Sequence, residues 1–95
     1  MRPRGQVAEG SARYFVERDG MLLASFARED DALLFEGELA DLDVARGITS
    51  ATCEVRDRHG RYRGGYLISG GRLVAFVADD AGEIRNRRAA RALRF

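Results

Sequence analysis

The sequence predicts one α+β domain, in which a central helix packs on an antiparallel sheet. Three observations predict this class. A "DG" dipeptide at residues 19–20 separates two short apolar segments, an acid-rich segment with helical spacing ends before Gly47, and Gly60, Gly71 and Gly82 then follow at intervals of eleven residues. Such an interval is typical of short antiparallel strands joined by tight turns. With 95 residues, the chain has enough apolar surface for one modest core and too little for two.

Residues 1–11 contain the only proline, two glycines and no apolar periodicity. We therefore expect them to form a flexible N-terminal arm, and residues 12–95 to form the domain. The segments "ARYFVER" and "MLLASFA" flank the "DG" dipeptide, whose residues tolerate the positive φ angles of a two-residue turn. These segments predict an N-terminal β-hairpin.

The segment "REDDALLFEGELADLDVARG" predicts a helix over about residues 29–44. Three acids at its start are favourable near the positive end of a helix dipole, and a glycine follows as a stop signal. At 100° per residue, four side chains fall within about 80° of one another. This predicted core stripe consists of Ala32, Phe35, Leu39 and Leu42.

The segments "ATCEVRD", "RYRGGYLIS" and "RLVAFVA" predict a C-terminal meander. A fourth strand depends on residues 79–86. Asp80 and Glu83 have the spacing of a capping box, which would start a terminal helix early, whereas Gly82 in the first turn of such a helix favours a hairpin. We expect the hairpin, followed by a short terminal helix from about Asn86. The whole order, hairpin, helix and three or four strands, is shared with β-grasp domains and with many other α+β folds.

The sequence provides no recognisable catalytic or metal-binding motif. Cys53 and His59 are the only residues of their types, and six residues of extended chain, about 20 Å, keep them apart within one subunit. A structural zinc site needs three or four such ligands, the acidic clusters lack a calcium loop, and no phosphate-binding glycine motif occurs. We therefore expect a protein that is not an enzyme and that needs no cofactor and no metal.

A single cysteine cannot form an internal disulfide, and no apolar segment has the length of a signal sequence or a membrane span. These features predict a cytoplasmic protein without a membrane partner. Sixteen basic and fifteen acidic side chains give a net charge of +1, so the total charge predicts no partner either.

The charges are nevertheless distributed unevenly along the chain. Residues 28–45 carry seven acids and one arginine, a net charge of −6. Residues 84–95 carry five arginines and no acidic side chain, and residues 56–63 carry four arginines and one aspartate, a net charge of +3. The sequence therefore predicts one acidic and two basic surfaces.

The acidic helix carries a candidate protein-binding site. Leu34 projects about 120° from the centre of the core stripe, and its helical neighbours are Asp30, Asp31, Glu38 and Asp41. An apolar side chain surrounded by carboxylates can anchor a basic protein partner, because the leucine supplies burial and the carboxylates supply orientation. Small size and the lack of catalytic motifs are typical of inhibitors and adaptors, including those carried by phages and mobile elements, such as anti-CRISPR proteins.

The alternative hypothesis is a nucleic-acid-binding module on the basic surfaces. Its residues are Arg58, Arg61, Tyr62 and Arg63 at a hairpin tip and Arg87, Arg88 and Arg91 on the terminal helix. Arginines would contact phosphates and the tyrosine ring would stack on a base. A third hypothesis is that the acidic and basic surfaces bind each other, within one chain or across a symmetric homodimer, which exposed strand edges would also favour.

Overall fold

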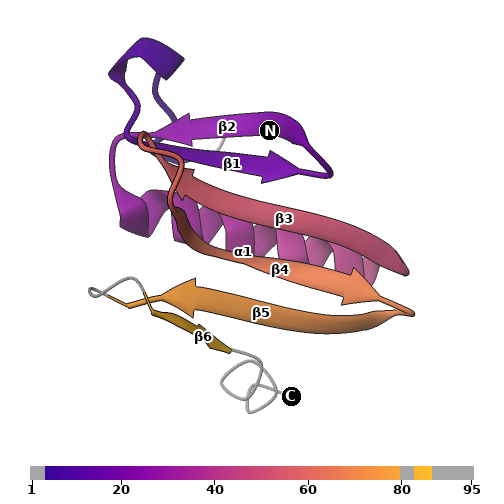
Figure 1. The fold of residues 1–95 in the computed structure, drawn as a ribbon. Coiled ribbons are helices and arrows are strands. Elements are labelled where there is room, and N and C mark those ends of the chain that lie inside the picture. The colour runs from indigo at the N-terminus through magenta and orange to yellow at the C-terminus, as the bar shows by residue number, and fades with distance from the viewer. Residues whose placement is uncertain (1–3, 80–82, 87–95) are drawn as a thin grey trace.

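A six-stranded antiparallel sheet carries one long helix on one of its faces in the computed structural model, which describes residues 4–79 and 83–86 (Figure 1). The elements are η1 (Glu9–Ser11), β1 (Tyr14–Arg18), β2 (Met21–Phe26), α1 (Glu29–Ala45), β3 (Ser50–Asp57), β4 (Tyr62–Ser69), β5 (Arg72–Ala78) and β6 (Ile84–Asn86). The strand order is β2-β1-β3-β4-β5-β6. The predicted α+β class, with an N-terminal hairpin, a central helix and a C-terminal meander, is confirmed.

The turns form where the sequence predicts them. Asp19 and Gly20 both have positive φ angles, 51° and 81°, which suits the two-residue turn between β1 and β2. At the other end of the sheet, the Asp79 N–H donates to the Glu83 carbonyl at 2.8 Å, and β5 pairs with β6. The hairpin prediction for residues 79–86 is therefore confirmed, and Asn86 ends β6. The predicted terminal helix falls on residues 87–95, outside the described residues.

The N-terminal arm lies beside part of the edge strand β2. The Val7 N–H donates to the Ser25 carbonyl at 2.9 Å, and Gln6 forms an isolated bridge with Phe26. These contacts cover the C-terminal half of β2. Met21 and Leu23, in the other half, remain 68% and 39% exposed.

The core lies between α1 and the sheet, and it is closely packed because small residues line the contact. Ala32 and Ala40 of α1 are fully buried, and Gly64 lies under Leu33. A Cβ atom on Gly64 would be 2.9 Å from the Leu33 Cδ2 atom, so a larger residue there would push the helix away from the sheet. The Phe26 and Phe35 rings, 5.6 Å apart between centroids, extend this contact toward β2.

The predicted core stripe of α1 is only partly correct. Ala32 is buried, Phe35 and Leu39 are half-buried, and Leu42 is 43% exposed. The helix instead turns Glu36 and Asp43 toward the sheet, and both are buried. At 100° per residue, the observed buried side is rotated by about 75° from the predicted one.

A buried hydrogen-bond network explains this rotation. Asp43 accepts two hydrogen bonds from the Arg18 guanidinium, at 2.9 and 3.0 Å, and one from the Tyr66 hydroxyl at 2.5 Å. Burial alone would raise the pKa of Asp43, but the hydrogen bonds from Arg18 and Tyr66 outweigh it and lower this pKa below its ordinary value. The Asp43 network, formed by these three residues, therefore ties α1 to β1 and β4.

We expect Asp43→Ala to destabilise the fold by about 2 to 3 kcal/mol. The substitution leaves the Tyr66 hydroxyl and the Arg18 guanidinium without their acceptor, and the partial exposure of Arg18 reduces the loss from that of a fully buried pair. Urea denaturation followed by circular dichroism measures the change. Glu38→Ala, on the exposed side of the same helix, is the control and should change the free energy of unfolding by less than about 0.5 kcal/mol. Equal stability of the two variants would contradict the role of the network.

The stabilisation by Asp43 should depend on pH. Because its pKa is lower in the folded protein, its contribution is present above the unfolded pKa and is lost as the pH falls through the folded pKa. The difference in free energy of unfolding between the wild type and Asp43→Asn should therefore be largest above about pH 5 and shrink below about pH 4. Denaturation at a series of pH values measures it. A difference that stays constant into strong acid would contradict this assignment.

Candidate functional site

The outward side of α1 carries the predicted protein-binding residues together. Leu34 is 50% exposed, and Asp30, Glu38 and Asp41 are also exposed. Asp31 is half-buried, because Gly5 of the N-terminal arm lies against its side chain. The structure thus places Leu34 at the surface, with carboxylates around it.

The structure adds Leu42 to this surface, which the sequence had assigned to the core. Asp30, Leu34, Glu38 and Leu42 follow one another at intervals of four residues, so they form one ridge along the helix. We call these four residues the acidic-leucine ridge. Its two leucines lie about 12 Å apart along the axis, and both remain about half exposed. Leu42 directly precedes Asp43 on α1. The partners of Asp43 lie on the strands β1 and β4, and this pairing is the signal that could have revealed the exposure of Leu42.

The ridge keeps its negative charge exposed. The only ion pair at the ridge within the described residues joins Asp30 to Arg28 at 3.9 Å, and both side chains are at least 75% exposed. A pair of this kind in water contributes little binding energy and is easily displaced. A basic partner could therefore approach Asp30 and Glu38 without first breaking a strong internal interaction.

The arginines of the β3–β4 hairpin tip are in a different situation, because most of them have internal partners. Arg61 forms an ion pair with Asp57 at 2.8 Å, and Arg63 forms one with Glu29 at 2.6 Å. Arg58 is exposed, and no ion pair in residues 4–79 and 83–86 involves it. Binding a phosphate backbone here would compete with these pairs.

The proposed stacking residue Tyr62 is also engaged. The Arg56 guanidinium carbon lies 5.9 Å from the centroid of the Tyr62 ring, and Arg56 also pairs with Glu54. Burial raises the pKa of the Tyr62 hydroxyl to about 12, with the charge of Glu54 acting in the same direction. Of the remaining candidates for nucleic-acid binding, Arg87, Arg88 and Arg91 lie outside the described residues.

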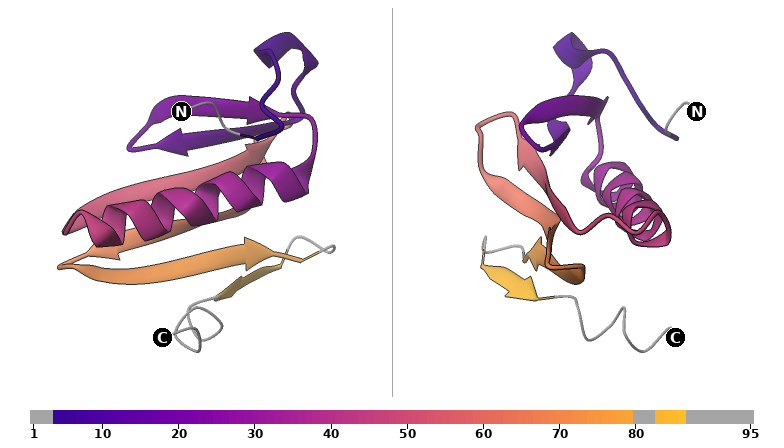
Figure 2. Two further views of the ribbon diagram at one scale, coloured as in Figure 1. Left: turned by 180° about the vertical axis from the view of Figure 1, so that it is seen from behind. Right: turned by 90° about the vertical axis from the view of Figure 1, so that its right-hand side faces the viewer.

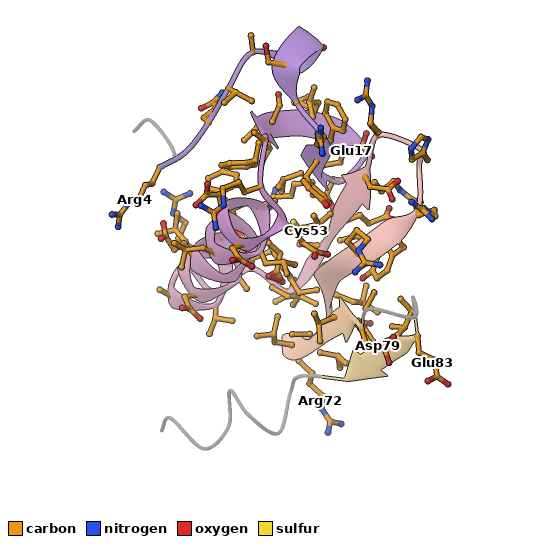
Figure 3. All side chains as sticks on the ribbon, turned by 90° about the vertical axis from the view of Figure 1, so that its left-hand side faces the viewer. Arg4, Glu17, Cys53, Arg72, Asp79 and Glu83 are labelled. Atoms are coloured by element: carbon orange, nitrogen blue, oxygen red, sulfur yellow. The ribbon has the colours of Figure 1, made fainter. Side chains whose placement is uncertain are left out.

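Cys53 and His59 occupy separate environments. The Cys53 side chain lies on the α1 side of the sheet (Figure 3) and is 1% exposed. His59 is exposed in the β3–β4 turn. Burial raises the pKa of the Cys53 thiol to about 12, and the negative charges of Glu36 and Asp43 add to this effect. The thiol is therefore protonated at neutral pH.

Two further features bear on ligands. No group of three or more His, Cys, Asp or Glu side chains is arranged to hold a metal ion in the described ranges. An open groove of about 270 Å³ lies between the N-terminal arm and β2, lined by residues 6–9 and 22–25, of which Glu9 alone is ionisable.

Neither α1 nor η1, the helices of the described part, is long and apolar enough to cross a membrane.

Comparison with known proteins adds no functional information. No family model, no curated protein and no solved structure matches the chain. Function has to be inferred from the surfaces of this molecule.

We expect Cys53 to be unreactive in the folded protein, because its thiol is buried and protonated. Iodoacetamide at pH 8 should leave it unmodified in native buffer and modify it fully in denaturant. Mass spectrometry of the intact protein measures the modification. Rapid modification of the native protein would place the thiol at an accessible site and reopen cysteine chemistry.

Proposed function

We propose that this protein is a non-enzymatic cytoplasmic binding protein, of the inhibitor or adaptor type, which binds another protein through the acidic-leucine ridge. The observation that carries the proposal is the exposure of Leu34 and Leu42 on the same side of α1 as Asp30 and Glu38. A single exposed leucine is ordinary on a protein surface. Two leucines that alternate with carboxylates in one row match the combination of apolar anchors and charged rim found at protein interfaces.

The charge of the ridge selects the partner. Exposed carboxylates repel a phosphate backbone and attract lysine and arginine side chains, so the ridge fits a basic protein surface. The paired arginines of the β3–β4 tip weigh against the nucleic-acid alternative, because three of the four arginines in residues 56–63 have an intramolecular partner.

The sizes of the apolar and the electrostatic contributions predict how the binding affinity depends on salt. Burying the exposed half of each leucine contributes about 1 kcal/mol, so both together give about 2 kcal/mol. This is too little for a stable complex by itself. Charge attraction must supply orientation and a fast association rate, and binding should weaken as salt is added.

Leu34→Arg should abolish partner binding without unfolding the protein. Immobilised wild type, Leu34→Arg and Leu67→Arg are compared for proteins captured from the natural host cells, and the captured protein is then titrated at several salt concentrations. Leu67→Arg is the matched control, because Leu67 is another half-exposed leucine, 42% exposed on β4, far from the ridge. We expect affinity to fall at least about tenfold for Leu34→Arg alone, with the thermal melt nearly unchanged.

Two results would contradict the proposal. One is capture of the same partner by Leu34→Arg with unchanged affinity. The other is a mobility shift of nucleic acid at low salt that Arg58→Ala removes, which would favour the nucleic-acid alternative.

A further inference from the structure

The face of the sheet opposite α1 carries apolar side chains on β1, β4 and β5 and polar side chains on β3, and no element in the described part of the chain covers it. Figure 2 shows α1 on one side of the sheet only. Side chains alternate along a strand, so the neighbours of residues buried under α1 point to the opposite side. This outer sheet face carries, on three strands, Phe15, Tyr62, Leu67, Val74 and Phe76.

The pairing register brings these side chains close to one another. Leu67 lies directly beside Val74, and Phe15 and Tyr62 lie on either side of Arg56. Leu67 is 42% exposed, and the other four apolar residues are half-buried by their neighbours in the sheet. An antiparallel sheet with one face in water usually shows polar side chains on that face. β3 follows this rule, with Ser50, Thr52, Glu54 and Arg56 on this face, whereas β4 and β5 beside it carry apolar side chains. An apolar patch with a polar border is the composition found at protein interfaces.

The charged groups on this face largely compensate each other. Arg56 pairs with Glu54 and lies over the Tyr62 ring. Glu17 on β1 and Arg72 on β5 are the other charged residues on this side of the described strands β1 to β5, and their charges are opposite. The face is thus close to neutral, unlike α1. A surface that meets a copy of itself brings like charges together, so self-association favours a neutral surface over the acidic-leucine ridge.

The outer sheet face is also low around Gly65. Gly65 has no side chain to rise above the strands, and a Cβ atom there would lie 2.9 Å from the Tyr62 hydroxyl oxygen and 2.0 Å from the Cys53 carbonyl oxygen. The Tyr62 side chain therefore occupies the space over Gly65 and lies along the sheet. Sheet faces pack against each other about 10 Å apart, with their side chains interdigitated.

We propose that the outer sheet face binds the same face of a second copy of this chain, forming a homodimer with two stacked sheets. Six strands about 4.8 Å apart and on average about six residues long give a face of about 600 Å². Two such faces bury about 1,200 Å², the lower limit for a specific interface. The dimer should therefore form with a dissociation constant on the order of micromolar and dissociate on dilution.

Sedimentation equilibrium over a wide range of protein concentrations tests this proposal. Wild type should approach the mass of two chains at high concentration and of one chain on dilution. Leu67→Arg should raise the dissociation constant at least about tenfold, because it places an unpaired charge in the interface. Leu34→Arg, on the opposite side of the molecule, should dimerise like wild type.

A second variant distinguishes loss of the dimer from loss of the fold. Thr52 is exposed on β3 and lies beside Leu67, so Thr52→Arg places a charge in the same interface while removing little packing. It should also give monomers, with a thermal melt close to that of wild type.

Two outcomes would overturn the proposal. One is a wild type that stays monomeric at every concentration. The other is a dimer that persists in both Leu67→Arg and Thr52→Arg, which would move the contact to another surface, such as the exposed half of β2. The proposed partner binding is tested separately, by titration at protein concentrations well below the dimer dissociation constant, where Leu34→Arg should lose the partner and Leu67→Arg should not.

Discussion

The Asp43 network determines how α1 lies on the sheet. A carboxylate on the sheet-facing side of a helix is unfavourable unless hydrogen bonds satisfy it, and here Arg18 from β1 and Tyr66 from β4 supply three. Rotating α1 by about 75° to bury the predicted stripe would cover Leu42 and gain about 1 kcal/mol. The same rotation would leave the buried Tyr66 hydroxyl and the Arg18 guanidinium unpaired, at a cost of about 1 to 3 kcal/mol for each group. The network outweighs the leucine, and the exposed ridge is a consequence.

Local chemistry explains why most of the fold was predictable. The turn at Asp19 and Gly20, the acids that begin α1, and the regularly spaced glycines each act over a few residues, so the sequence alone reveals them. The rotation of α1 depends on Arg18 and Tyr66, which lie more than twenty residues from Asp43. A helical pattern that assigns every carboxylate to solvent cannot detect the pairing of Asp43 with Arg18 and Tyr66. The exposure of Leu34 was therefore predicted correctly, and the exposure of Leu42 was not.

The difference between local signals and interactions of distant residues also explains the β3–β4 tip. Strict alternation along β4 predicts that Arg63 shares a side of the sheet with Arg61 and points away from Tyr62. The register between β3 and β4 shifts between Val55 and Arg56, which leaves Arg63 as the extra residue. Arg63 can then reach Glu29 at the start of α1. Pairings of this kind occupy most of the tip arginines, so these arginines are less available to a ligand than Glu38 of the ridge.

The two proposed surfaces lie on opposite sides of one sheet, and this arrangement has a mechanical consequence. A dimer that stacks the outer sheet faces would place α1 of each copy on the outside, so two acidic-leucine ridges would face away from each other. Each ridge gains only about 2 kcal/mol from its leucines, which makes a single contact weak. A partner assembly that presents two basic surfaces could engage both ridges, and the second contact would then form at a high effective concentration. Weak self-association would in this way compensate for the small apolar area that the Asp43 network leaves exposed on α1.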